Sequence, residues 1–269
     1  MNITLTINSN KHEIECAPSE TLLSTVRRLG YFGVKFGDEQ GLSGADTVLL
    51  DGKPVNAGSM LAAQAEGHNV VTIEALGEHP DQGWKKTDGL NPLQQAFVES
   101  GAIQCGFCTP AQILAAKALL EKNSNPSEEQ VREAIAGVLC RCTGYLKPVQ
   151  AVLKAAAVMR GEGTQVDRET SRQVNMESSG HGGDSPVYVS PFLPVSETLV
   201  QTNIMPRVIV TPQTETYQTV GKPEKKVDAV KLVQGKPAFT ADMDVRGMLY
   251  AKVLHSPHAH ARIKKIDTT

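Results

Sequence analysis

Apolar and polar residues alternate at the start of the chain with the two-residue period of a half-buried strand. Met-Asn-Ile-Thr-Leu-Thr-Ile occupies residues 1–7, and similar short apolar stretches recur up to residue 73. Asp51-Gly52 is a strong hairpin signal because both positions accept positive φ angles. The pattern predicts five strands, over residues 3–7, through Ile14 and Cys16, and over residues 47–50, 53–55 and 70–73.

One helix is expected within this first part of the chain. Leu22, Leu23, Val26 and Leu29 recur at the spacing of a helix face, with Ser19 as the expected N-terminal cap and a glycine directly after Leu29 as the stop. Residues 1–78 therefore predict a small α+β unit in which a twisted sheet packs against one helix.

Residues 88–160 carry the capping and proline signals that are typical of a series of short helices. Asn91-Pro92 and Thr109-Pro110 each place a capping side chain before a proline at the first helical position, which is a favoured site for proline. Ser127 and Gln130 form a capping box before another apolar run, and Pro148 is expected to open a last helix. The pattern predicts a bundle of four helices.

The chain loses this periodicity over residues 161–227, where Gly, Ser, Thr and Pro accumulate. A structureless loop of this length does not belong inside a compact domain, so the segment is interpreted as a linker. The composition becomes more apolar again over residues 228–269, and Gly247 begins an apolar run that continues to Leu254 without a terminating cap. An incomplete domain is expected there.

Charge and hydropathy narrow the function classes. The formal net charge is −2, which gives no reason to expect nucleic acid or an acidic membrane surface as partner. No stretch approaches the roughly 18 apolar residues of a membrane span, and the first residues lack the features of a signal peptide. We therefore expect a soluble, cytoplasmic protein in which cysteines act as metal ligands more often than in disulfides.

Four of the five cysteines fall in two close pairs, Cys105-x-x-Cys108 and Cys140-x-Cys142. Four thiolates in this pattern can hold an iron-sulfur cluster or a zinc ion. Zinc ribbons usually separate their pairs by roughly 15 to 20 residues, whereas residues 109–139 separate these two and read as helices. The spacing favours a cluster held between helix ends. A zinc-stabilised docking or interaction protein without a redox role is the alternative.

The residues around the cysteines carry a resemblance to a known family. Gln-Cys-Gly-Phe-Cys-Thr-Pro at 104–110 and Leu-Cys-Arg-Cys-Thr-Gly-Tyr at 139–145 resemble the helical 2Fe-2S domain of the molybdenum hydroxylases, the xanthine dehydrogenase and aldehyde oxidoreductase family. The resemblance implies a β-grasp domain like that of plant-type ferredoxins before the helical bundle. It also implies one 2Fe-2S cluster on Cys105, Cys108, Cys140 and Cys142, with Gln104 and Cys142 also approaching the molybdopterin.

Family members normally carry a second 2Fe-2S cluster in the first domain, with cysteines spaced C-x4-C-x2-C-x11-C. This chain keeps the spacing but has Asp38, Ser43, Asp46 and Gly58 at the four positions. Iron-sulfur clusters need soft thiolates, so this second cluster is expected to be absent. The loop is interpreted as a relic closed by side-chain hydrogen bonds to backbone amides; a site for a hard cation is the alternative.

The last part, residues 228–269, resembles the first strands of the molybdenum-binding subunit, an α/β hammerhead domain that needs many more residues. The resemblance implies an electron-transfer part of a molybdenum hydroxylase that acts on a purine, another N-heterocycle or an aldehyde. The expected partners are the rest of the molybdenum-binding polypeptide and a flavin subunit, with FAD, or another electron acceptor. With the second cluster missing, the first domain could serve as a docking module.

Overall fold

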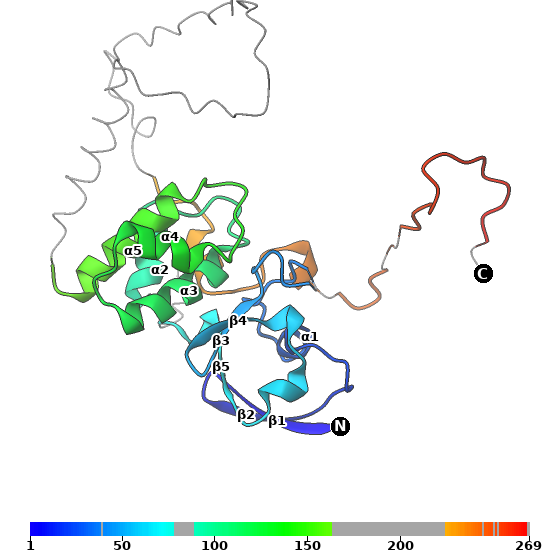
Figure 1. Ribbon diagram of the computed structural model, residues 1–269, viewed down its shortest axis with the longest axis horizontal. Coiled ribbons are helices and arrows are strands. Elements are labelled where there is room, and N and C mark those ends of the chain that lie inside the picture. Colours follow the sequence, from blue (N-terminus) through cyan, green and yellow to red (C-terminus); the bar gives the residue numbers. More distant parts are fainter. Residues whose placement is uncertain are drawn as a thin grey trace, which may run out of the picture.

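The computed structural model describes residues 1–38, 40–77, 89–162, 224–243, 245–249, 251 and 253–267. Residues 1–77, the sheet unit, hold all the strands found in the described part of the chain. Residues 89–162, the helical unit, lie against one side of the sheet unit (Figure 1). Most of the predicted linker falls outside the described residues.

The sheet unit contains a five-stranded mixed sheet in the order β2-β1-β5-β3-β4. Its strands are β1 (Asn2–Ile7), β2 (Asn10–Glu15), β3 (Thr47–Leu50), β4 (Lys53–Asn56) and β5 (Asn69–Val71). The central pair β1 and β5 is parallel, and the other neighbours are antiparallel. The predicted hairpin turn is confirmed, because Asp51 and Gly52 both adopt positive φ angles, 47° and 77°.

Alternation along β1 gives the sheet its apolar face. Ile3, Leu5 and Ile7 are buried, and they pack in one cluster with side chains of helix α1 (Leu22–Arg28). The helix ends as predicted, at Gly30 with φ 94°. Its predicted N-cap is wrong, because the Thr21 hydroxyl accepts the Ser24 N–H at 3.2 Å. Ser19 lies outside the first turn, where a side-chain oxygen cannot reach the N–H groups that need a partner. Three short 3₁₀ helices complete the unit, over Ala57–Ser59, Ala62–Ala65 and Ile73–Ala75.

Four helices form the helical unit, as predicted: α2 (Pro92–Glu99), α3 (Thr109–Lys122), α4 (Glu128–Ile135) and α5 (Leu146–Met159). The predicted caps at Asn91 and Ser127 are confirmed, each within a capping box. Cys108, and not Thr109, is the N-cap residue of α3. Helix α5 begins at Leu146, before Pro148, because a proline in the first turn has no intrahelical N–H bond to lose.

The two units share a hydrophobic core. Leu49, Ile73 and Leu76 of the sheet unit belong to the same buried cluster as the apolar side chains of α2, α3 and α5. Helix α3 lies against β3 and β4. The sheet therefore supports the helix that follows the first cysteine pair.

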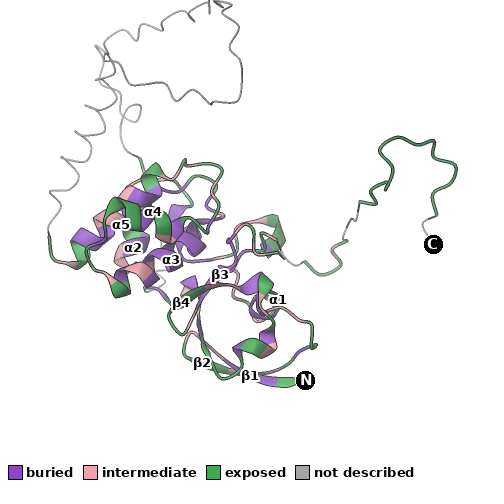
Figure 2. Cartoon of the chain, in the orientation of Figure 1, coloured by how far each residue is buried: buried purple, intermediate pink, exposed green. Residues whose placement is uncertain are grey.

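The segment after the linker differs from the prediction. Residues 229–233 form a helix, α7 (Ala229–Val233), and a 3₁₀ turn covers Thr240–Asp242. The described residues between 245 and 267 form no strand and are almost all exposed (Figure 2). The expected strand over 247–254 is therefore not seen among its described residues. A strand needs a neighbour for its backbone groups, and none pairs with the described residues of this segment.

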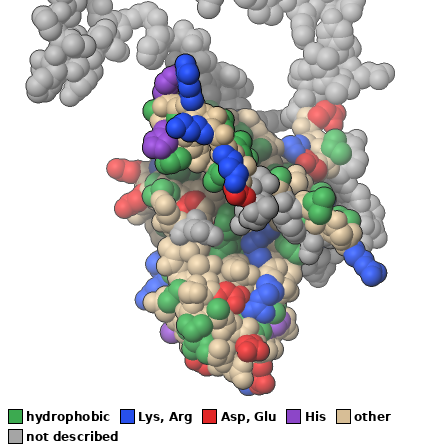
Figure 3. All heavy atoms as spheres, turned by 90° about the vertical axis from the view of Figure 1, so that its right-hand side faces the viewer, with side chains coloured by type: hydrophobic (Ala, Val, Ile, Leu, Met, Phe, Trp, Pro, Cys, Tyr) green, Lys and Arg blue, Asp and Glu red, His purple; other side chains and the backbone are tan. Residues whose placement is uncertain are grey.

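Within the described residues, no helix combines the length and the apolar character that a membrane crossing needs. On the face drawn in Figure 3, basic and acidic side chains are interspersed over the described residues without a broad area of one sign.

Candidate metal centre

The four cysteines lie on two loops that meet at helix ends. Cys105 and Cys108 occupy the connection from α2 to α3, and Cys140 and Cys142 occupy the connection from α4 to α5. Across the loops, Cys105 lies close enough to Cys142, and Cys108 close enough to Cys140, for each neighbour to raise the pKa of the first thiol. The fold thus brings together all four residues that the sequence analysis selects, in two pairs that each join one loop to the other.

The two pairs differ in burial. Cys105 and Cys142 are exposed, whereas Cys108 is buried and Cys140 is half-buried. The inner pair, Cys108 and Cys140, packs with a small apolar cluster formed by Ala111, Ala115 and Val138. Gln104, which directly precedes Cys105 of the outer pair (Cys105 and Cys142) in the sequence, is also exposed. The centre therefore has one side embedded in protein and one side open to a partner.

Burial and neighbouring sulfurs set the acidity of the thiols. Burial raises the pKa of Cys105 and raises that of Cys108 far more, and the nearby cysteines add to both effects. Burial also opposes ionisation of Cys140, but hydrogen bonds from Thr143 and from backbone N–H groups outweigh it and lower the pKa of that thiol. Metal ligation needs thiolates, so a metal that binds here must displace protons from the buried sulfurs.

Tyr145 holds the second cysteine loop in shape. Its hydroxyl accepts the backbone N–H of Cys140 at 2.8 Å and donates to the carbonyl of Val138 at 3.2 Å. Its backbone is left-handed, with φ 67°, and its N–H donates to the Thr143 hydroxyl at 3.1 Å. The same hydroxyl lies 3.1 Å from the Cys140 sulfur. Sequence reasoning assigned no role to these two side chains, although both stand in the second motif.

Replacing Tyr145 with phenylalanine should loosen this loop. The change leaves the Cys140 N–H and the Val138 carbonyl without their partner, which is expected to reduce the free energy of unfolding by about 1–3 kcal/mol. Tyr31→Phe is the control, because it also removes a hydroxyl hydrogen bond, at 2.9 Å to His12, but far from the cysteines in sequence and within the sheet unit. Denaturant titration measures both. Equal, negligible losses would contradict the role given to Tyr145.

The donor set fits a two-iron group. A 2Fe-2S cluster is held by four cysteine thiolates, and the two cysteine loops together would supply that number. In the described part of the chain, no three or more His, Cys, Asp and Glu side chains are arranged to hold a single metal ion.

Comparison with known proteins places this centre in a family. A family model described as a [2Fe-2S] binding domain matches residues 72–153, which include all four cysteines. The small FeS subunit of nicotinate dehydrogenase from Eubacterium barkeri is 43% identical over 149 residues, which cover 55% of this chain and 89% of that subunit. The chain belongs to the xanthine dehydrogenase and aldehyde oxidoreductase family. It is the iron-sulfur portion of such an enzyme.

Two further members of the family show how the chain relates to longer proteins. A probable hypoxanthine oxidase of Escherichia coli is 27% identical over 270 residues, which cover all of this chain and 23% of that protein. The crystal structure of the aldehyde oxidoreductase from Desulfovibrio desulfuricans has a TM-score of 0.56 and 41% identity, over 62% of this chain and 18% of that one. The chain thus also matches a small part of larger family members.

The positions that the family resemblance assigns to a second cluster are now closed by polar contacts. The Asp38 carboxylate accepts the backbone N–H groups of Gln40, Leu42 and Ser43 at 2.8, 2.9 and 2.7 Å. Asp46 is fully buried; one of its oxygens accepts the N–H of Gly58 at 2.5 Å, and the other has no hydrogen-bond partner. These contacts are the ones that the relic interpretation predicts.

Asp38→Asn should weaken this loop in a pH-dependent way. Hydrogen bonds from the Ser43 side chain and from backbone amides hold the pKa of Asp38 far below its ordinary value. A lowered native pKa contributes stability above the unfolded-state pKa, and this contribution is lost as the pH falls toward the native pKa. Both carboxylate oxygens of Asp38 accept backbone N–H groups, and asparagine replaces one of these oxygens with an NH2 group that cannot accept. The variant should therefore melt at a lower temperature at pH 7. Melting curves from pH 7 to pH 3 should show the gap narrowing below about pH 4; a constant gap would contradict the assignment.

The loop over residues 38–46, which we call the relic loop, directly contacts the second cysteine loop, which carries Cys140 and Cys142. The backbone N–H of Leu139 donates to the carbonyl of Ser43 at 2.8 Å. The next residue, Gly44, has φ 64°, and a side chain there would overlap the carbonyl oxygen of Gly137. Glycine is the residue that combines this backbone conformation with so close an approach. The loop that contains Ser43 and Gly44 therefore packs directly against the second cysteine loop, which carries Cys140 and Cys142.

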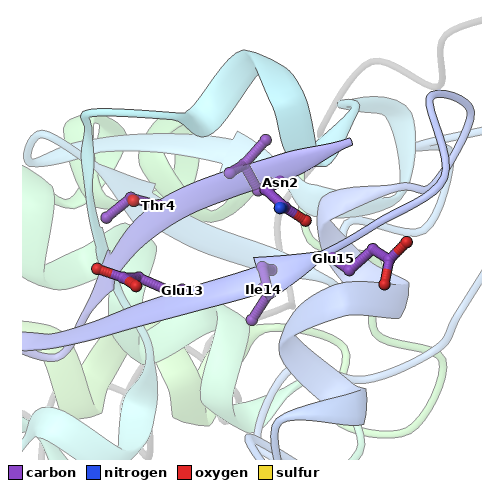
Figure 4. Close-up of a pocket in the computed structure, with 6 residues that line it drawn as sticks. Asn2, Thr4, Glu13, Ile14 and Glu15 are labelled. Atoms are coloured by element: carbon purple, nitrogen blue, oxygen red, sulfur yellow. The ribbon is translucent and has the colours of Figure 1, made fainter.

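A hollow of about 280 Å³ on the sheet unit is not part of this centre (Figure 4). Asn2 and Thr4 of β1 and Glu13 and Glu15 of β2 line it. It lies at the β2 edge of the sheet, whereas α3 packs at the opposite edge, against β3 and β4. No cysteine lines this hollow.

Proposed function

We propose that this chain transfers electrons within a molybdenum hydroxylase through one 2Fe-2S cluster held by Cys105, Cys108, Cys140 and Cys142. Such a cluster takes up and releases one electron at a time. The observation that carries the proposal is the meeting of two cysteine loops in two cross-loop thiol pairs. The family-model match to a [2Fe-2S] binding domain over the same residues supports it.

The outer pair is proposed as the electron-entry side. Cys142 and Gln104 are exposed on that side, where a molybdopterin held mainly by another part of the enzyme could reach both residues. On the inner side, Leu139, directly before Cys140, donates its backbone N–H to the carbonyl of Ser43 in the relic loop. Electrons then leave toward a flavin subunit with FAD, or toward another acceptor, without a second cluster in the sheet unit.

Relatives support the proposed partners and substrate class. The names of the relatives include a small FeS subunit of nicotinate dehydrogenase, a probable hypoxanthine oxidase and an aldehyde oxidoreductase. We infer a purine, another N-heterocycle or an aldehyde as substrate, oxidised in a molybdenum-binding polypeptide that continues this chain or joins it as a subunit. The α/β hammerhead assignment for residues 228–269 belongs to this inference. The sheet order and the parallel β1–β5 pair support the β-grasp assignment for the sheet unit.

Metal and sulfide analysis of the purified chain tests the proposal. We expect about two iron atoms and two sulfides per chain, with visible absorption that bleaches on reduction. About four iron atoms with two distinct paramagnetic signals would contradict the single cluster. A colourless protein with one zinc ion would instead support the alternative, a zinc-stabilised docking protein.

A further inference from the structure

Residues 224–243, which we call the strap, contact both the helical unit and the sheet unit. In Figure 1 the strap is coloured yellow-orange to orange and runs from the helical unit to the sheet unit near α1. Its side chains Val230, Leu232 and Val233 are buried in the shared core. A helix of five residues has almost no stability of its own, so the strap takes this shape because of what it contacts.

The first half of the strap covers the loop that carries Cys105 and Cys108. Gly106, between them, has φ 83°, and a side chain there would come within 2.5 Å of Leu232. The ring of Phe107 packs edge-on against that of Phe239, with 5.2 Å between centroids. Nearby, the buried Gln94 side chain donates to the carbonyl of Val233 at 2.8 Å. The strap therefore covers the first cysteine loop at Gly106 and Phe107, while Cys105 stays exposed.

The second half of the strap is anchored on the sheet unit by a buried carboxylate. Asp242 forms ion pairs with Lys35 at 2.7 Å and with Arg27 at 3.0 Å. The side chains of Lys35 and Asp242 are only 2% and 1% exposed. The Arg27 guanidinium also donates to the carbonyl of Ala241 at 2.7 Å, and the Lys35 ammonium lies 4.9 Å from the ring centre of Phe239.

The Asp242 carboxylate also organises the strap itself. It accepts the backbone N–H groups of Ala238 and Phe239, both at 3.2 Å. Removing one partner of a buried ion pair leaves an uncompensated charge inside the protein. The anchor therefore specifies both where the strap binds and how its second half is folded.

We propose that the sheet unit is a docking module for the strap, in which Lys35 and Arg27 bind the Asp242 carboxylate and so hold Leu232 and Phe239 over the first cysteine loop. This gives the sheet unit a function that needs no cluster of its own. The occupant is this chain's own segment, which overlaps the start of the proposed molybdenum-binding part, residues 228–269. Its effect on the cluster rests on the proposed function; the docking does not.

Hydrogen exchange of the whole 269-residue chain, followed by mass spectrometry, tests the docking. Asp242→Asn and Leu232→Ser should each speed exchange over residues 229–242 by about tenfold or more, while α5 stays protected. Asp267→Asn is the matched control, since its partner Lys265, at 3.2 Å, forms the same type of ion pair on the surface. It should leave the strap unchanged.

Leu232→Ser is the decisive variant if Asp242→Asn unfolds the whole sheet unit, because it changes a strap residue and leaves no unpaired charge in the sheet unit. Rapid strap exchange with a protected β1 and β5 then supports docking. The proposal is overturned if the strap exchanges in the unaltered chain as fast as residues 253–267, or if both variants leave its exchange unchanged.

A second measurement follows iron release to a chelator from the iron-loaded chain. Leu232→Ser should release iron about tenfold faster, since it opens the loop around Gly106. A chain that loads no iron contradicts the proposed function and leaves the exchange result standing. Unaltered release together with rapid strap exchange would refute the protection of the cluster while supporting the docking.

Discussion

Replacing Cys108 with alanine is expected to leave the purified chain without a cluster. Cys108 is the most deeply buried of the four predicted ligands, and its sulfur pairs with that of Cys140. Alanine offers no donor atom, and the apolar surroundings of the inner pair admit no replacement ligand. Iron should fall from about two atoms per chain to near zero, with loss of the visible absorption.

Cys16→Ala is the matched control for this experiment. Cys16 is the fifth cysteine and is also buried, but it lies in the core cluster of the sheet unit. Its replacement should reduce the free energy of unfolding by about 1 kcal/mol and leave the iron content unchanged. Iron retained in Cys108→Ala, or lost equally in Cys16→Ala, would reject the proposed ligand set.

Gly44→Ala should destabilise the contact between the relic loop and the second cysteine loop. The new methyl group would overlap the Gly137 carbonyl oxygen, and the residue must also keep φ 64°. Strain and overpacking together are expected to reduce the free energy of unfolding by about 3 kcal/mol. Thermal or denaturant unfolding measures the loss.

Gly52→Ala separates the two contributions. Gly52 also has a positive φ, 77°, but a side chain there would meet nothing within 4 Å. Its loss should be about 1 kcal/mol, from backbone strain alone. Losses of the same size in both variants would show that the close approach between the two loops contributes little.

Local signals in the sequence predicted the helices well, because they act over a few residues. Asn91 and Ser127 cap their helices through capping boxes that can be read directly from the spacing. The exact helix starts were harder to predict where tertiary contacts decide them. Helix α5 begins at Leu146 because Tyr145 turns left-handed while its hydroxyl binds the preceding loop, and nothing in the local pattern specifies this.

Contacts between distant segments set the limit of the sequence analysis. Spacing selected the four cysteines, but it could not tell which sulfur of one loop would meet which sulfur of the other. Residues 228–269 resemble the first strands of the molybdenum-binding subunit, yet residues 229–233 form a helix because α2 and α3 bury them. The partnership of Lys35 with Asp242 joins residues 207 positions apart, beyond the reach of any periodicity.

The covalent continuity of the strap with the sheet and helical units has a consequence for assembly. A segment tethered to its own binding surface meets that surface at an effective concentration on the order of millimolar. A contact whose dissociation constant lies well below that concentration is then almost always formed, at any dilution of the protein. The small FeS subunit from Eubacterium barkeri aligns with only 55% of this chain. In a family enzyme that supplied the equivalent segment from a separate polypeptide, the fraction with the segment docked would depend on the concentration of that polypeptide. In this chain the docked fraction does not depend on concentration.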